Sequence, residues 1–310
     1  MTHAHLPQLD RLFLTDAGLE SDMIFNRGID LPCFSSLMLL TSAEGRAALE
    51  RYFRDFIALA QRSGTGLVLE TATWRASSDW AEKLGLSQGE LDHLNCEAVT
   101  SLIALRDEFE TPIVVSGCIG PRGDGYDPGA IMTRDEAADY HSRQAATLAD
   151  AGAEMISALT MTNINEAIGI VRAAKATGLP VAISFTAETD GRLPTGDRLE
   201  DAIAAVDEAT DSYAAYFGVN CAHPSHFAAA LTSGGAAIRR VKAVRANASK
   251  CSHEELDAMT ELDDGNPAEL GAEYRELLDK LPQLTVLGGC CGTDIRHITA
   301  IAESCVKVAA

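Results

Sequence analysis

Short apolar runs rich in β-branched residues alternate along the chain with longer segments in which apolar residues recur every three or four positions. The short runs are typical of buried strands, and the longer segments are typical of amphipathic helices. The strands expected from this pattern are Leu12–Thr15, Gly66–Thr71, Pro112–Cys118, Glu154–Thr160, Pro180–Thr186, Ala215–Cys221, Val241–Arg245 and Leu284–Cys290. The helices expected between and after them are Ala43–Ser63, Gly89–Phe109, Arg134–Ala151, Ile164–Thr177, Arg198–Thr210, Pro224–Thr232, Pro267–Leu281 and Asp294–Val308.

Several of these helices carry end signals in the sequence. Gly64, Gly152 and Gly178 each follow a helical segment, where a glycine favours a C-terminal cap. Thr133 precedes Arg134 and has Glu136 three positions later, which predicts a capping box. The helix boundaries therefore have local causes in addition to the apolar periodicity.

Alternating strands and helices over 310 residues fit the α/β class and predict a single (β/α)8 TIM barrel. No linker or composition shift divides the chain, so residues 1–310 are expected to form one domain. The segments Gly123–Gly129 and Cys251–Asn266 are expected to be long loops. An open doubly wound sheet is the alternative, but no GxGxxG or GxxxxGK[ST] motif follows a strand to support its nucleotide-binding forms.

The charge balance excludes some classes of partner. The formal charge is −20, from 45 acidic and 25 basic side chains. Nucleic acids and anionic membranes attract basic patches, so neither is an expected partner. No apolar run reaches the roughly 18 residues of a membrane span, and the first residues lack the pattern of a signal peptide. A cytoplasmic location follows as the expectation.

Eight cysteines in a reducing compartment indicate metal binding or catalysis before disulfides. Cys221 ends the sixth expected strand, and Cys290 and Cys291 end the eighth. Because active sites of such barrels lie at the carboxyl ends of the strands, the three thiols are expected to converge there. Three thiolates bind zinc and leave the fourth tetrahedral position open, which is typical of a catalytic site.

The two adjacent cysteines lie in the sequence LGGCCG. In a regular strand their side chains would point to opposite faces, so the backbone is expected to leave β geometry there. Gly288, Gly289 and Gly292 are expected to permit that bend. The remaining cysteines are expected to pack as small apolar residues. His223 and His226 could complete a metal site, but they are preferred as polar loop and helix-start residues.

Six segments in chain order resemble one known family. These are FLTDAGLESDMIFNRGID, LETATWRAS, SGCIGPRGDGY, DGRLPTGDRLEDAI, GVNCAHP and LGGCCGTDIRHITAIAE. Together they resemble the homocysteine S-methyltransferase family over nearly the whole chain, and the last two are the most specific. The resemblance implies a Zn²⁺-containing barrel that moves a methyl group onto a small thiol, with Cys221, Cys290 and Cys291 as zinc ligands.

The resemblance also implies small-molecule partners and their contacts. The partners are a thiol and a methyl donor with a good leaving group, namely a sulfonium, a quaternary ammonium or a methylated cofactor. Asp16 is expected to orient the substrate amine, and the backbone N–H groups of Thr71 and Ala72 are expected to hold a carboxylate. Asn220 is expected to fix Cys221 or the neighbouring loop beside the substrate.

Two positions depart from the family pattern. The family's Asp-Gly-Gly turn has Ala17 at its second position, and Leu159 stands where the family often has a glutamate for the substrate amine. Either Asp16 or Glu70 replaces that carboxylate, or the acceptor is a thiol other than homocysteine. Trp74, Trp80 and Tyr126 could face a cationic donor, although core or loop packing is preferred for each.

Three alternatives remain open from the sequence. The chain could methylate another thiol or a selenol, it could take its methyl group from a corrinoid, or it could be a zinc-binding barrel without turnover. The donor is unassigned, and a homo-oligomer is one option for the assembly.

Overall fold

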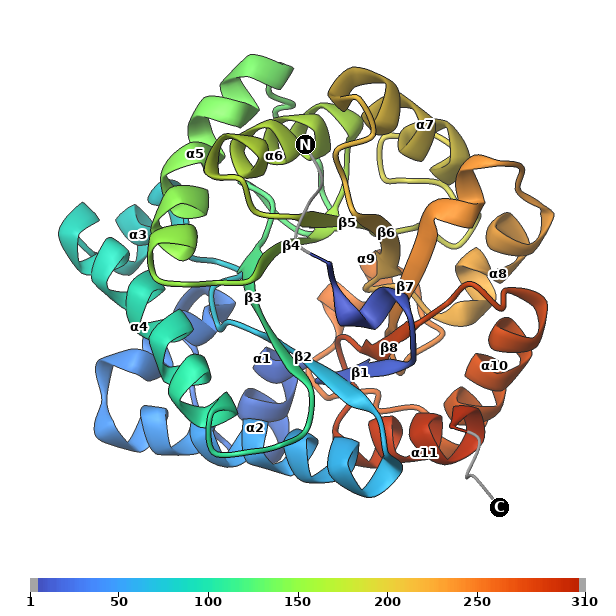
Figure 1. The fold of residues 1–310 in the computed structure, drawn as a ribbon, viewed down its shortest axis with the longest axis horizontal. Helices are drawn as coiled ribbons and strands as arrows, with labels where there is room; N and C mark the ends of the chain where they lie inside the picture. Colours follow the sequence, from blue (N-terminus) through green and yellow to red (C-terminus); the bar gives the residue numbers. More distant parts are fainter. Residues whose placement is uncertain (1–4, 307–310) are drawn as a thin grey trace.

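In a computed structural model, which describes residues 5–306, eight parallel strands close into a barrel with β8 paired back to β1. The strands are β1 (Phe13–Thr15), β2 (Gly66–Glu70), β3 (Ile113–Ile119), β4 (Met155–Met161), β5 (Val181–Phe185), β6 (Tyr216–Asn220), β7 (Val241–Ala246) and β8 (Val286–Gly289). Figure 1, which looks down the barrel, shows the ring of helices outside the strands. The predicted (β/α)8 barrel is confirmed.

The outer layer consists of the helices that the apolar periodicity predicted. They are α2 (Ala43–Ser63), α4 (Gln88–Arg106), α5 (Arg134–Asp150), α6 (Ile164–Thr177), α7 (Leu199–Thr210), α8 (Pro224–Ser233), α10 (Pro267–Lys280) and α11 (Ile295–Cys305). The last expected helix ran to Val308, and residues 307 and 308 lie outside the described part. Within residues 5–306, no helix has both the length and the apolar character needed to cross a membrane.

The loops contain short helices and helical turns that the apolar periodicity of the sequence did not predict. They are α1 (Leu19–Ser21), α3 (Ser78–Leu84), α9 (His253–Ala258), a π-helical turn at Asp22–Asn26 and 3₁₀ turns at Pro7–Leu9, Pro32–Phe34, Ser36–Thr41 and Ala237–Arg240. The expectation of one long loop over Cys251–Asn266 is wrong, because α9 forms inside it. Ser252 and Glu255 cap this helix reciprocally, but six residues are too few to display a helical period.

The helix-end signals are confirmed. Thr133 and Glu136 form the capping box that starts α5. Gly64 and Gly178 are left-handed C-terminal caps of α2 and α6, with φ of 65° and 83°. Gly152 follows the cap of α5 with φ of 99°. These local stops fix where each helix turns back to the next strand.

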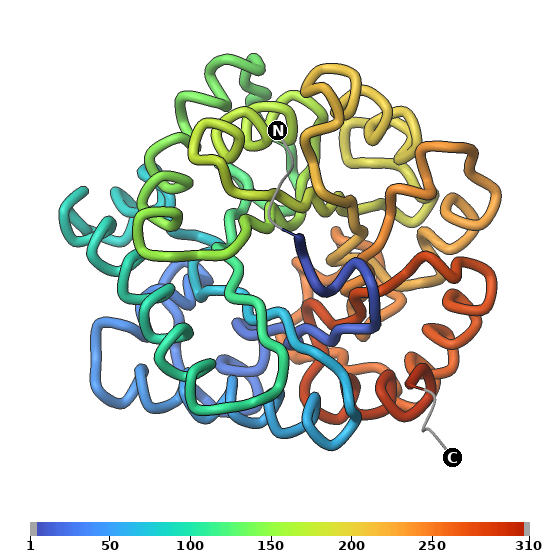
Figure 2. Tube along the Cα trace, in the orientation of Figure 1, coloured from blue at the N-terminus to red at the C-terminus, as the bar shows by residue number. Residues whose placement is uncertain are grey.

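One end of the barrel is closed by apolar side chains. The buried residues at the beginnings of the strands pack with Leu6 of the preceding segment; they are Phe13, Val68, Val114, Met155, Ala182, Tyr216, Ala243 and Val286. Figure 2 shows the dark blue start of the chain crossing this end of the barrel. The residues that follow the ends of the strands therefore lie at the opposite end of the barrel.

Candidate active site

Three cysteines meet at the carboxyl ends of two strands. Cys221 follows β6, and Cys290 and Cys291 follow β8. Their sulfur atoms all lie within 4.8 Å of one another. The Cα atoms of Cys221 and Cys290 are 5.3 Å apart, although 69 residues separate them in the chain. The structure thus brings together the three thiols that the sequence analysis selected.

Cys221 and Cys290 are joined by a disulfide, and Cys291 is free. The sequence analysis favoured metal binding or catalysis over disulfides, and for this pair the structure has a disulfide. The physical reason is proximity, since a Cα separation of 5.3 Å suits a disulfide as well as two ligands of one ion. Only the reduced pair offers thiolates to a metal.

The chain leaves β geometry directly before the cysteine pair, as predicted. β8 ends at Gly289. The Cys290 N–H is donated to the Ala246 carbonyl at 2.8 Å, and the Cys291 carbonyl accepts the Ala248 N–H at 3.1 Å. These two bonds fasten the turn to the end of β7, so that both sulfurs face the barrel mouth.

The glycines around the pair serve two different purposes. Gly292 has a φ of 79°, which a side chain disfavours. Gly288 and Gly289 lie within β8, where an added Cβ would collide with Thr15 and Thr293 respectively. The expected backbone freedom thus applies to Gly292, whereas Gly288 and Gly289 are needed because neighbouring side chains approach closely.

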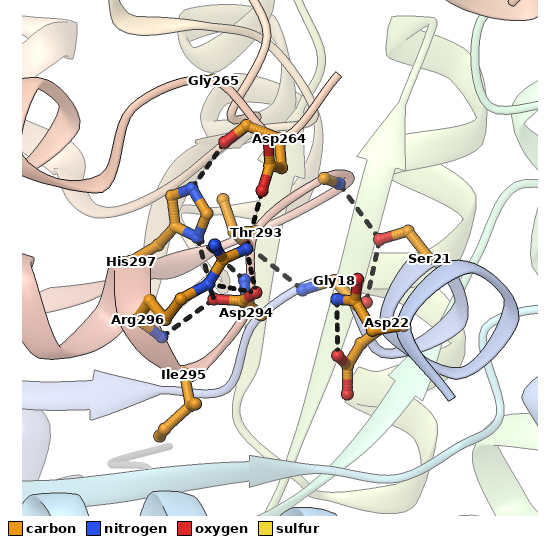
Figure 3. A network of polar contacts seen from close by, with 12 residues as sticks. Gly18, Ser21, Asp22, Asp264, Gly265, Thr293, Asp294, Ile295, Arg296 and His297 are labelled. Atoms are coloured by element: carbon orange, nitrogen blue, oxygen red, sulfur yellow. Dashed lines mark hydrogen bonds and ion pairs between the residues drawn. The ribbon is translucent and has the colours of Figure 1, made fainter. Parts of the chain in front are cut away.

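A polar network locks the turn after the cysteines to the loop after β1 (Figure 3). The Gly292 N–H is donated to Ser21 Oγ at 3.0 Å. The Gly18 N–H is donated to Thr293 Oγ1 at 3.2 Å. The two contacts join residues that are 271 and 275 positions apart in the chain. The first and last βα loops therefore form one rigid wall of the site.

The same network continues to the start of α11. Asp294 caps this helix, and Arg296 bonds both Asp294 and Asp264. Burial acts to raise the pKa of Asp294, but hydrogen bonds from His297 and Arg296 outweigh it and lower that pKa. The carboxylate remains ionised and holds the start of α11 in place through its contacts with Arg296 and His297 (Figure 3).

Asn220 and Thr160 support two of the sulfurs. The Asn220 amide nitrogen lies 3.8 Å from Cys290 Sγ, and the Thr160 hydroxyl lies 3.6 Å from Cys221 Sγ. Thr160 has a φ of 63°, which is unfavourable for a β-branched residue. An unfavourable backbone conformation persists only where neighbouring groups stabilise it. Here the Asn220 side chain forms hydrogen bonds with both the N–H and the hydroxyl of Thr160.

Tyr126 and His253 support the third sulfur and the Cys221 peptide. The Tyr126 hydroxyl points at Cys291 Sγ from 3.7 Å, and its ring stacks on His253 at 3.8 Å. His253 Nε2 lies 2.8 Å from the Cys221 carbonyl oxygen, and its Nδ1 lies 3.1 Å from Glu188. Burial raises the pKa of the Cys291 thiol to about 11, so this thiol is protonated near neutral pH in the absence of a cation.

The cysteines border a cavity of ≈ 330 Å³. Its buried polar lining residues are Asp16, Ser21, Glu70, Thr71, Thr160, Asn220 and Arg245. Phe34, Trp74, Tyr126 and Leu159 contribute partly buried apolar or aromatic surface, and Asp124 and Asp257 are exposed acids. Arg75 also lines the opening and pairs with Asp124 at 2.9 Å. The cavity therefore combines thiols and charged side chains within one space large enough for a small substrate.

A buried arginine dominates the charged interior. Arg245 Nη2 donates to Asp16 Oδ1 at 2.6 Å, and Arg245 Nη1 lies 3.8 Å from Glu70 Oε1. Burial lowers the pKa of Arg245, but Asp16 and Glu70 outweigh it and the net effect raises it. Burial raises the pKa of Glu70 to about 7, and Arg245 opposes that shift. Cys118 lies beside them, and burial raises the pKa of its thiol well above the ordinary value.

The sequence profile of the family described as Homocysteine S-methyltransferase matches residues 13–305. The chain belongs to the homocysteine S-methyltransferase family. It is a methyltransferase on this evidence, and the resemblance stated from the sequence is confirmed.

Individual family members are distant in sequence. Homocysteine S-methyltransferase 3 of Arabidopsis thaliana is 24% identical over 94% of this chain and 88% of its own length. Homocysteine S-methyltransferase YbgG of Bacillus subtilis (strain 168) is 27% identical over 75% of this chain and 77% of its own. The fold is shared with the Escherichia coli homocysteine methyltransferase MmuM. Its oxidized form has a TM-score of 0.75 at 20% identity, covering 94% of this chain and 95% of that one, and its metallated form has a TM-score of 0.74 at 19% identity, covering 94% and 96%.

The substrate contacts that the family implies are only partly available here. Asp16 lines the cavity, but one oxygen bonds Arg245 and the other accepts a hydrogen bond from Tyr52 at 3.3 Å. The Thr71 N–H is donated to the Ser116 carbonyl. Ala72 is buried and is not among the described residues that line this cavity. Asn220 was expected to fix Cys221 or the neighbouring loop, and its amide nitrogen lies 3.8 Å from Cys290 Sγ.

The aromatic residues named in the sequence analysis differ in position, and one of the two histidines is a helix cap. Trp74 and Tyr126 line the cavity, whereas Trp80 is buried beneath Arg75, whose guanidinium lies 4.1 Å from the ring centroid. Core packing is therefore confirmed for Trp80. His223 caps the start of α8, which confirms its interpretation as a helix-start residue.

Sequence reasoning missed three residues of the site. Arg245 ends the expected strand Val241–Arg245, and a charged residue at the carboxyl end of a barrel strand could have raised the question of a role in the site. His253 lies in a segment with no periodicity, and Thr160 is unremarkable in sequence because its positive φ is a property of the folded backbone. No local pattern could have selected the last two.

Proposed function

We propose that Cys221, Cys290 and Cys291 hold Zn²⁺, and that the chain transfers a methyl group from a cationic donor to the thiol of homocysteine. The observation that carries this proposal is the cluster of three sulfurs within 4.8 Å of one another at the edge of the cavity. The donor set fits zinc, which prefers thiolates in a tetrahedral arrangement. Cys221, Cys290 and Cys291 would hold the ion, which would supply the Lewis acidity that lowers the pKa of an acceptor thiol.

The names of the relatives support homocysteine as the acceptor. The plant and Bacillus relatives are both called homocysteine S-methyltransferases. A cavity of ≈ 330 Å³ has room for a small thiol and the methyl end of a donor. Of the two exposed carboxylates at its opening, that of Asp124 is paired with Arg75 at 2.9 Å, and that of Asp257 favours a cationic donor over a neutral one.

The reaction balances as a single displacement. A lone pair of the acceptor sulfur forms the new bond to the methyl carbon, and the bond from that carbon to the onium atom breaks. Its electron pair leaves with the neutral donor product, and the thiol proton goes to solvent. Bound zinc supplies the acidity that keeps the acceptor as a thiolate near neutral pH.

The chain's own residues position these groups and exclude water. Asn220 and Tyr126 direct hydrogen-bond donors at the sulfurs of Cys290 and Cys291, which fixes their orientation. Leu159 and Trp74 give the cavity apolar walls. Charge is neutralised when a thiolate meets an onium ion, so a site with little water favours the transition state over the separated ions.

The test starts from reduced protein purified without chelator. We expect near-stoichiometric zinc, and turnover of homocysteine with at least one donor among S-methylmethionine, betaine and a methylated corrinoid. Cys221→Ser, Cys290→Ser and Cys291→Ser should each reduce zinc content and activity together. Cys96→Ser is the matched control, because Cys96 is a half-buried cysteine of α4 that does not line the cavity.

Two results would contradict the proposal. Unchanged zinc content in the variant lacking all three cysteines would remove them as ligands. Full zinc with no turnover for any donor would favour a metal-binding barrel without catalysis.

A further inference from the structure

A second cavity, of ≈ 270 Å³, lies between α2 and α4, which are neighbours in the outer ring of helices (Figure 1). Among residues 5–306, it shares no lining residue with the active-site cavity. Ala72 lines the second cavity, whereas Thr71 and Trp74 line the first. The segment that follows β2 therefore borders both cavities.

The interior of the second cavity is apolar. Its buried apolar lining residues include Leu40, Leu49, Phe53, Ala98, Leu102 and Leu105. Protein interiors are normally close-packed, and side chains that border a cavity lose dispersion contacts on that side. Apolar cavities take up small apolar molecules, which restore such contacts. An apolar body is therefore the first requirement for a ligand of this cavity.

The rim of the second cavity is charged and has an acidic end. Arg46 and Glu97, which both line it, are paired across the two helices, with Arg46 Nη2 donating to Glu97 Oε2 at 3.0 Å. Glu50 and Glu108 also line it, and a single guanidinium serves both of them. Arg54 Nη2 lies 2.8 Å from Glu50 Oε1 and 2.8 Å from Glu108 Oε2. This group of three side chains therefore has an excess of one negative charge.

We propose that the cavity between α2 and α4 binds a small molecule with an apolar body and one ammonium group. The apolar body packs on Leu49, Phe53 and Leu102, and the ammonium lies at the rim beside Glu50 and Glu108. A cation there balances the excess charge, and an anion would add to it. The inference is independent of the proposed methyl transfer, because the cysteines take no part in it.

The test compares three probes that share a phenyl body and differ in charge. Phenethylamine, 2-phenylethanol and 3-phenylpropanoate are titrated into the full chain and followed by ligand-observed NMR. Phenethylamine should bind about 2–5-fold more tightly than 2-phenylethanol, which is the scale of an exposed ion pair, and 3-phenylpropanoate should bind most weakly. A wild type that does not bind phenethylamine, or binds the anion as tightly as the cation, overturns the proposal.

Variants of the rim test the charge preference without disturbing the packed interior. Glu50→Gln combined with Glu108→Gln should abolish or reverse the advantage of phenethylamine over 2-phenylethanol. Asp55→Asn is the matched control, because Asp55 is an exposed acid of α2 that does not line the cavity. It should keep the wild-type preference. An undiminished preference in the double variant would place the amine elsewhere and refute the assignment.

Ala98→Leu tests the apolar interior, because the larger side chain occupies space between the helices. All three probes should bind about 10-fold or more weakly, since the added carbon atoms displace part of the phenyl body. Circular dichroism and the unfolding midpoint show whether the variant is native, and unchanged binding by native Ala98→Leu contradicts the proposal. A dimer in sedimentation equilibrium that Ala98→Leu dissociates would assign the cavity to a second copy of the chain instead.

Discussion

Asn220 of β6 and Thr160 of β4 are joined by two hydrogen bonds of 2.8 Å, which hold a threonine backbone at a φ of 63° beside Cys221. Both side chains are buried. The side-chain carbonyl of Asn220 accepts a hydrogen bond from the Thr160 N–H. Its amide nitrogen donates to Thr160 Oγ1 and faces Cys290 Sγ. One side chain thereby supports a strained strand end and orients a sulfur.

Asn220→Ala should destabilise the fold by about 2–3 kcal/mol, because it leaves the Thr160 N–H unpaired and removes the restraint on its φ. Urea denaturation measures the change. Asn165→Ala is the matched control, because its side chain bonds the Met132 carbonyl at 3.2 Å in a partly exposed position; it should cost well under half as much. Equal losses in the two variants would show that the Asn220 contacts carry no special weight.

Zinc binding should depend on the redox state of the Cys221–Cys290 pair. The disulfide removes two of the three thiols in the cluster. Oxidised protein should therefore bind no zinc in a metallochromic titration, and reduction should release two further thiols together with about one zinc site. Zinc uptake by fully oxidised protein, with thiol counts unchanged, would place the metal elsewhere.

Glu70 should make stability decrease as the pH rises. Burial raises its pKa to about 7 in the folded chain, against an ordinary value of 4.5. Between these values the unfolded chain loses its proton first, so the free energy of unfolding falls as pH rises through the window and levels off above about 7. The shift corresponds to about 3 kcal/mol, at 1.36 kcal/mol per pKa unit.

Thermal unfolding at pH values across that window measures the effect against Glu70→Gln, which should lack this decline. Glu97→Gln is the control, since Glu97 lies near the surface of α4 and Arg46 lowers the pKa of its carboxyl. A wild-type profile parallel to that of Glu70→Gln would mean that the folded and unfolded chains bind the Glu70 proton alike.

His253→Ala should weaken zinc binding. The imidazole supports the Tyr126 ring and bonds the Cys221 carbonyl, so its loss frees both the hydroxyl facing Cys291 and the Cys221 peptide. Groups that orient metal ligands are typically worth about 10–100-fold in affinity. Competition with a chelator on reduced protein measures it.

His226→Ala is the matched variant, because the His226 ring reaches the Lys250 carbonyl at 3.0 Å and does not line the cavity. Its zinc affinity should match the wild type. A loss of affinity as large as that of His253→Ala would assign the effect to general loosening of the loops.

The sequence by itself determined the barrel and the positions of the three cysteines. Strand and helix periodicities are local, and capping signals such as Thr133 with Glu136 act within a few residues, so they could be read directly from the chain. The placement of Cys221 and Cys290 at one mouth followed from the barrel, since parallel strands all end on the same side.

The tertiary structure alone decided how the interior charges pair. Arg245 and Asp16 are 229 positions apart, and they meet because β7 and β1 lie on either side of β8 in the closed barrel. The positive φ of Thr160, the stacking of His253 on Tyr126 and the disulfide between Cys221 and Cys290 likewise arise between distant segments. Such contacts are set by packing around a closed barrel, and the local propensities of the residues cannot predict them.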